Sequence, residues 1–273
     1  MRGPILTGAA RRRGGRALAA AALLCAALVA CGGGDGGGGG TGIAGDPADD
    51  APAPSPAGLW RGVTADGRAL EGVVLGDGAF SFLYSGPDGA GETAGVVAGE
   101  GAVEGGSLTA SRALDYRLGV EGGASAFALE ATFSARATLD GTLTYESGET
   151  SSFTSAHVEG SSAPADLGRL AGDYTGTVAN ASGDFGAGLS IGADGAFTGD
   201  TDDGCAFSGA FAARADANAY EVAIDAAGEA CAPGTDALVG LAFLDPDAGD
   251  GLVAVLRDDS LATVTVFGGR RGP

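Results

Sequence analysis

An alternation of polar and apolar residues with a period of two constrains the fold of this chain more than any other feature. From residue 127 to residue 145 every odd position is apolar, aromatic or small, while the even positions include Glu130, Arg136 and Asp140. Successive side chains of a strand point to opposite faces, so this pattern is typical of antiparallel strands with one buried and one wet face. At about 3.3 Å per residue the stretch is too long for one strand. We therefore expect two strands, with a turn near Thr138–Gly141.

The same period recurs along the rest of the chain. It appears around Phe207 and Phe211, and again in 220–224, 252–256 and 261–267. The Asp258-Asp259-Ser260 segment between the last two runs is a candidate hairpin turn. A short stretch after Pro164, at residues 165–170, is the one place where we expect helix. The pattern predicts an all-β fold.

Two copies of one plan follow each other. Residues 58–62 (GLWRG) match 172–176 (GDYTG), and 77–80 (DGAF) recur as 194–197. Chance matching is the alternative, because Gly makes up 53 of the 273 residues. A true repeat changes the fold assignment, so it has to be considered first.

Each copy has room for seven or eight short strands, which is typical of a sandwich or an up-and-down barrel. We expect two tandem antiparallel β-barrel or β-sandwich domains, at residues 58–160 and 168–268. The sequence leaves open whether they close separately or form one joined β unit.

The N-terminus has the form of a secretory signal. Residues 1–16 carry five Arg and no acid, and residues 17–30 are fourteen consecutive apolar residues. A basic start before a short apolar core is typical of an export signal and is too short for a membrane span. Arg11-Arg12 leaves twin-arginine export as an alternative route. We predict a signal peptide over residues 1–30.

The signal ends in a motif for lipid attachment. Leu28-Val29-Ala30-Cys31 resembles the bacterial lipobox, in which the Cys thiol receives diacylglycerol and the chain is cut before that Cys. The resemblance implies that Cys31 is lipidated, which makes the membrane a partner; because the acidic chain repels anionic head groups, we expect the anchor alone to make this contact. Because Gly32, not Asp, follows the Cys, the resemblance favours the outer membrane of a Gram-negative envelope. An ordinary signal that happens to end in Cys is the alternative.

Residues 31–57 are rich first in Gly and then in Pro, Ala and Asp. Such a composition buries too little apolar surface to offset its ordering entropy. We expect a flexible tether between the anchor and the β-domains.

The domains carry further resemblances. The opening aromatic-x-Gly strand resembles the start of lipocalin-like and avidin-like barrels and, more loosely, the barrels of transferrin-binding surface lipoproteins. The GLWxG opening, the AGxYxG segment in mid-chain and the Gly204-Cys-x-Phe-x-Gly strand resemble a group of proteobacterial lipoproteins that has no assigned activity. These resemblances imply a fold and a location but no chemistry.

The charge balance argues against nucleic acid as a partner. The formal net charge is −20, from 35 acids and 15 basic residues. Affinity for nucleic acid comes mainly from Lys and Arg that neutralise phosphates. We expect no nucleic-acid partner and no cofactor.

Cys205 and Cys231 are the two thiols that remain in the predicted mature body apart from Cys31. An exported protein meets an oxidising compartment, so a Cys205–Cys231 disulfide is the natural interpretation. Two free buried thiols are the alternative.

Catalytic motifs are weak. His157 is the single His, and the nearby Ser151, Ser152 and Ser155 form no nucleophile elbow. A pair of carboxylates could serve a hydrolase, but no aromatic-rich cleft sequence accompanies such a pair. We expect a protein that is not an enzyme.

Two acid-rich turns are weak candidates for Ca²⁺, which prefers oxygen-rich loops. Neither has the spacing of an EF-hand, and solvated turns are the alternative. The candidate ligands are Asp200, Asp202, Asp203, Asp245, Asp247 and Asp250.

Three functions remain open. The leading hypothesis is a lipid-anchored envelope protein with a binding or structural role and an unknown protein or small-molecule ligand. The second is a small-ligand carrier that holds its ligand inside a barrel. The third is a carboxylate-based hydrolase.

Overall fold

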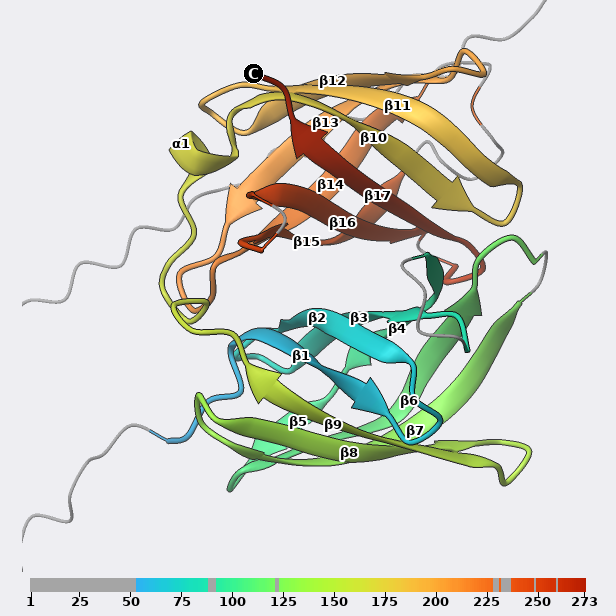
Figure 1. Cartoon of the computed structure of the whole chain (residues 1–273), viewed down its shortest axis with the longest axis vertical. Coiled ribbons are helices and arrows are strands. Elements are labelled where there is room, and N and C mark those ends of the chain that lie inside the picture. The colour runs from blue at the N-terminus through green and yellow to red at the C-terminus, as the bar shows by residue number, and fades with distance from the viewer. Residues whose placement is uncertain are drawn as a thin grey trace, which may run out of the picture. The chain divides into compact units, whose positions relative to one another are not determined.

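The computed structural model describes residues 53–87, 92–120, 123–227, 231, 237–247, 249–258 and 260–273, without the side chains of 225–227. All of them belong to one compact unit. They fold almost entirely into antiparallel strands that close into two eight-stranded barrels in tandem (Figure 1). The all-β prediction is confirmed, and the open choice between one joined unit and two barrels is settled in favour of two.

The first barrel is an up-and-down meander. Its long strand β6 pairs with β4 along one half and with the short β5 along the other, and this shared pairing closes the ring. Its strands are β1 (Gly58–Thr64), β2 (Ala69–Val74), β3 (Ala79–Ser85), β4 (Thr93–Glu100), β5 (Ala102–Glu104), β6 (Ser107–Arg117), β7 (Ala124–Ser134), β8 (Thr138–Tyr145) and β9 (Thr150–His157).

The second barrel follows after a single helical turn, α1 (Leu167–Leu170), where the sequence predicts one. Its first and last strands pair to close the ring. Its strands are β10 (Gly172–Asn180), β11 (Gly183–Ile191), β12 (Ala196–Thr201), β13 (Ala206–Ala213), β14 (Ala219–Ala227), β15 (Leu238–Asp245), β16 (Gly251–Asp258) and β17 (Val264–Arg271).

The turn within residues 127–145 lies earlier than the alternation predicts. Strand β7 ends at Ser134 and β8 begins at Thr138, so the turn occupies residues 135–137, directly before the segment Thr138–Gly141, which itself lies in β8. Ser134 pairs with Thr138 across a loop of three residues, in which Arg136 has a φ of 56°. An odd loop keeps the inward face on odd positions in both strands, so the alternation passes through the turn without a break.

The internal repeat is confirmed in the backbone. Gly58 and Gly172 open the first strand of each barrel with φ values of 144° and 145°, a conformation that side chains other than Gly rarely adopt. The aromatic residue two positions later donates a hydrogen bond to the carbonyl four residues before it, over 2.9 Å in both barrels.

The second matched segment, the two Asp-Gly turns, is also equivalent in structure. The carboxylate of Asp77 accepts from the backbone N–H of Ala79, and Asp194 accepts in the same way from Ala196. Both copies of the motif therefore form the same turn at the start of the third strand of their barrel.

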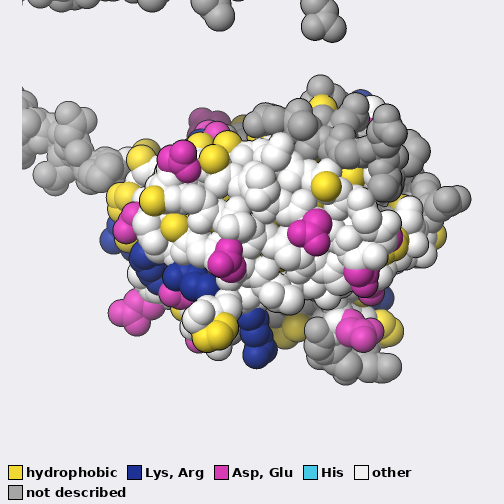
Figure 2. Space-filling model, turned by 90° about the horizontal axis from the view of Figure 1, so that it is seen from above, with side chains coloured by type: hydrophobic (Ala, Val, Ile, Leu, Met, Phe, Trp, Pro, Cys, Tyr) yellow, Lys and Arg dark blue, Asp and Glu magenta, His cyan; other side chains and the backbone are white. Residues whose placement is uncertain are grey.

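Each barrel has its own apolar interior, and two further apolar clusters join their outer faces. The interiors hold aromatic and aliphatic side chains from alternating positions of every strand. Outside, Leu59 and Leu75 of the first barrel share a buried cluster with Phe243 of the second, while Tyr116 shares another with Val255. Figure 2 shows one face of the molecule, on which hydrophobic side chains lie scattered among acidic and basic ones. Among the described residues, no helix has the length and apolar character that a membrane span needs.

Candidate functional site

The first barrel contains a cavity of about 1100 Å³. The cavity lies at the end of the barrel where β1 finishes, and its lining includes Thr64, Tyr84, Asp115, Phe127 and Tyr145. Ligand pockets in proteins measure roughly 300–1,000 Å³, so the space is large enough for an organic molecule.

Trp60 fills the opposite end of the same barrel. Its side chain is fully buried, and its indole N–H donates to the carbonyl of Pro56 over 2.9 Å. Pro56 and Ala57, which end the predicted tether, are themselves buried. The barrel is therefore packed at one end and hollow at the other.

A buried carboxylate lies in the cavity and is held by two phenols. Tyr84 Oη donates to one oxygen of Asp115 over 2.7 Å, and Tyr145 Oη donates to the other over 2.8 Å. Asp115 is only 7% exposed. Buried carboxylates are costly unless they accept hydrogen bonds, and here both oxygens do. We call these three residues the Tyr–Asp–Tyr cluster.

A bulge in β6 turns Asp115 inward. Pairing of β6 with β7 shifts register between Ala110 and Ala113, so inward positions change from even to odd. Without the bulge, the alternation along β6 would put Leu114 and Tyr116 inside and Asp115 outside. The alternation does not predict this cluster, because it assumes an unbroken register along β6.

The phenol of Tyr84 reaches Asp115 across Gly95 of the neighbouring strand β4. A Cβ atom at Gly95 would lie 2.2 Å from Tyr84 Oη. Only glycine leaves room for the ring at this position.

Both phenols in the cluster keep their protons at neutral pH. Burial, together with the adjacent Asp115 carboxylate, raises the pKa of Tyr84 and of Tyr145 well above the ordinary value. The cluster is therefore a fixed unit, in which two neutral donors face one acceptor.

Two arginines line the cavity near its mouth. Arg68 Nε donates to Asp66 over 2.7 Å, and its guanidinium lies 5.6 Å from the centre of the Tyr84 ring. Arg117 follows Asp115 by two residues on β6 and is exposed. Including Asp115, four carboxylates and two guanidinium groups line the space.

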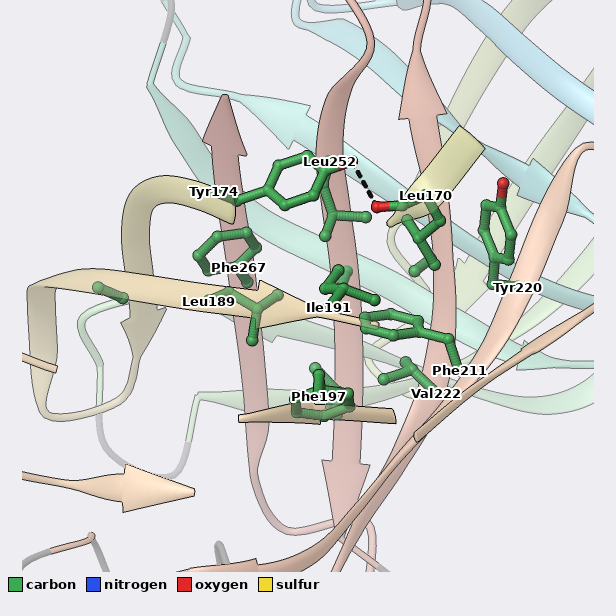
Figure 3. Packing of buried hydrophobic residues seen from close by; sticks show 14 of the residues in the cluster. Leu170, Tyr174, Leu189, Ile191, Phe197, Phe211, Tyr220, Val222, Leu252 and Phe267 are labelled. Carbon is green, nitrogen blue, oxygen red and sulfur yellow. Dashed lines mark hydrogen bonds between the residues drawn. The ribbon is translucent and has the colours of Figure 1, made fainter. Parts of the chain in front are cut away.

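The second barrel has a smaller and more apolar cavity. Its volume is about 300 Å³, and its walls come mainly from Val, Leu, Ile and Phe side chains. Figure 3 shows the packed part of this barrel, where the Tyr174 hydroxyl donates to the carbonyl of Leu170 beside Phe211 and Tyr220. Tyr174 thus takes the place that Trp60 has in the first barrel.

The second cavity differs from the first at two positions that lie at equal distances from the matched Asp-Gly turns. Thr201 occupies the place of Tyr84, and Gly199 occupies the place of Phe82. The ring of Phe207 fills the space over Gly199, where a Cβ atom would lie 2.5 Å from its carbons. The second interior therefore lacks the Tyr84 phenol and is narrowed by an aromatic ring.

The predicted disulfide is present. Cys205 before β13 is bonded to Cys231 after β14, and Cys205 lies at the wall of the second cavity. Cys31, with the signal peptide and residues 31–52 of the tether, lies outside the described residues.

The six candidate calcium ligands do not gather at one place. Asp245 and Asp247 accept from Arg61, Asp250 accepts from Arg169, and Asp203 accepts from Thr201. In the part of the chain that the structure describes, no three His, Cys, Asp or Glu side chains form a group able to hold a metal ion.

His157 lies at the end of β9, half-buried against the edge of Trp60 with ring centres 5.1 Å apart. Its Nε2 is 2.9 Å from Ser162 Oγ and 3.2 Å from Ser161 Oγ. Burial lowers the pKa of His157 below the ordinary value. The ring of His157 thus packs at the place where the chain leaves the first barrel.

No protein-family model matches the chain, and no curated protein matches its sequence. Among solved structures, a Nostoc punctiforme protein of unknown function from the DUF3598 family is similar over 80% of this chain and 96% of its own, with 10% identity and a TM-score of 0.28. Transferrin binding protein B from serogroup B Neisseria meningitidis is similar over 75% of this chain and 52% of its own, with 12% identity and a TM-score of 0.27. Transferrin binding protein B from Haemophilus parasuis is similar over 74% of this chain and 53% of its own, with 12% identity and a TM-score of 0.24.

Proposed function

We propose that this chain is a lipid-anchored protein of the bacterial cell envelope that binds a small molecule in its first barrel and catalyses no reaction. The single observation that carries the binding role is a cavity of about 1100 Å³ with a buried carboxylate inside it. Eight-stranded barrels are wide enough to hold one small ligand.

The arrangement of polar groups supports binding over catalysis. Asp115 is held on both oxygens by phenols, and the raised pKa of each phenol keeps it from acting as a base near neutral pH. His157 lies beside Trp60 at the packed end of the barrel. His157 is thus separate from the cavity, and the Tyr–Asp–Tyr cluster is fixed within it.

The predicted anchor supports the envelope location. The lipobox at residues 28–31 and the Gly-rich segment after it would hold the barrels close to a membrane surface on a tether. An acidic chain repels anionic head groups, so the lipid alone would make the membrane contact.

Native mass spectrometry of the full chain from its own host tests the binding role. We expect an extra mass on the wild type that is lost when Ser125→Trp fills the cavity beside Asp115, its partner across β6 and β7. Thr132→Trp is the matched control, because it adds the same ring to the exposed face of the same strand. Absence of any bound mass, or its retention in Ser125→Trp, would contradict the proposal.

Labelling of cells with palmitate tests the anchor. The wild type should incorporate the label and Cys31→Ala should not. An unlabelled wild type, or a labelled Cys31→Ala variant, would show that the lipobox interpretation is wrong.

A further inference from the structure

The Tyr–Asp–Tyr cluster offers a ligand hydrogen-bond acceptors and no donors. A phenol has one O–H, and both phenols donate theirs to Asp115. What remains free are lone pairs on the two phenol oxygens and on the carboxylate, which has about four acceptor sites in all. A group that binds here must therefore bring its own protons.

The charges around the cavity favour a cation. Four carboxylates line it, at Asp66, Asp115, Glu146 and Glu149, against the two guanidinium groups of Arg68 and Arg117. Arg68 is already bonded to Asp66. Arg117 is exposed, while Asp115 is buried. Charges interact more strongly away from water, so the buried carboxylate outweighs the exposed guanidinium in the interior.

Aromatic rings form part of the remaining wall, together with aliphatic side chains. Phe82 and Phe153 lie with ring centres 6.2 Å apart, and Phe127 and Tyr145 with ring centres 5.9 Å apart. Such walls favour an apolar body, and aromatic faces also attract cations.

We infer that the first barrel takes a small amine with an apolar body, with its ammonium group against Asp115. This inference rests on the proposed function and names the class of ligand for the same cavity. An ammonium group supplies three donors, which match the acceptors that the cluster leaves free.

Three probes of one shape test the inference by calorimetric titration of the full chain. Phenethylamine, 3-phenylpropanoate and 2-phenylethanol share a phenyl group and a short chain and differ in the charge of the head group. We expect the amine to bind at least about tenfold more tightly than either other probe, the factor typical of one hydrogen bond to a charged group.

Variants of the cluster separate the carboxylate from the phenols. Asp115→Asn should weaken amine binding about tenfold or more, because it removes the charge and introduces a donor. The double variant Tyr84→Phe with Tyr145→Phe keeps the rings and the carboxylate and removes two acceptors, so it should weaken amine binding less than Asp115→Asn does. Thr201→Val, at the matching place in the second barrel, should leave amine binding unchanged.

The outcomes are distinct from those of the binding test. Tighter binding of the anion or the alcohol, unchanged amine binding in Asp115→Asn with native folding, or no binding of the amine at millimolar concentration would each overturn the inference. The proposed binding role would still hold after any of these results if native mass spectrometry finds a bound mass that Ser125→Trp removes. Loss of amine binding in the double variant to the level of Asp115→Asn would also overturn it, because the phenols and not the carboxylate would then hold the ligand.

Discussion

The two barrels share one backbone plan and differ in what fills the open end. Each begins with a glycine of positive φ and an aromatic residue that plugs one end through a hydrogen bond to the carbonyl four residues back. In the first barrel the other end holds a cavity of about 1100 Å³ with a buried carboxylate, and in the second an apolar cavity of about 300 Å³. The opening glycine and the aromatic plug are repeated in both barrels, while the residues around the cavities are not. Function can therefore diverge at the cavities without loss of the fold.

The aromatic residue that plugs each barrel gives the largest expected effect on stability. Trp60→Ala should destabilise the protein by about 3–5 kcal/mol, because it removes the largest fully buried side chain and leaves a hole. Amide hydrogen exchange should show the loss of protection mainly in β1–β9. Tyr174→Phe, at the equivalent residue of the second barrel, keeps the ring and removes only the hydroxyl contacts with Leu170 and Arg271, so it should cost only about 1 kcal/mol. Equal effects of the two variants would mean that the aromatic ring does not act as a plug.

Loss of the disulfide should also affect the two barrels differently. Replacing both Cys205 and Cys231 by Ser should lower stability by ~3 kcal/mol, the entropy cost of a loop of this length in the unfolded chain. The loss of exchange protection should be greater in β10–β17 than in β1–β9. The converse distribution would contradict the assignment of this crosslink to the second barrel alone.

The phenols of the cluster come third. Tyr84→Phe leaves one oxygen of buried Asp115 without a donor, at a cost of about 1–3 kcal/mol. Urea denaturation measures this loss. Asp115→Asn combined with Tyr84→Phe removes the charge as well, so the two changes should not add. An additive result would indicate that the hydrogen bond does not form.

A rise in pH has the smallest expected effect, because folding stability changes little near neutral pH. Burial raises the folded-state pKa of Tyr84 and of Tyr145, so the unfolded chain loses these protons first. Their neutral forms stabilise the fold fully below about pH 10, the unfolded pKa, and this contribution is lost as the pH rises further. Urea denaturation from pH 8 to pH 11 should show the fall, and Tyr84→Phe with Tyr145→Phe should flatten it. An unchanged slope in that variant would contradict the assignment.

The repeat and the strands could be predicted because both depend on local spacing, and the disulfide because an exported chain with two remaining thiols meets an oxidising compartment. Phe127, Leu129 and Phe133 point inward as their alternation predicts. The turn position and the cluster were missed for one reason. The alternation tells only whether odd or even positions of a strand face inward. A three-residue loop preserves parity across a turn, and a bulge reverses it within β6, so the buried position of Asp115 could not be read from its neighbours.

Amide NMR titration of the full chain with phenethylamine tests the central contrast between the barrels most directly. We expect saturable shifts confined to residues around Tyr84, Asp115 and Tyr145, and none around the second cavity. Shifts centred on Phe207 and Ile224, or equal shifts in both barrels, would contradict it.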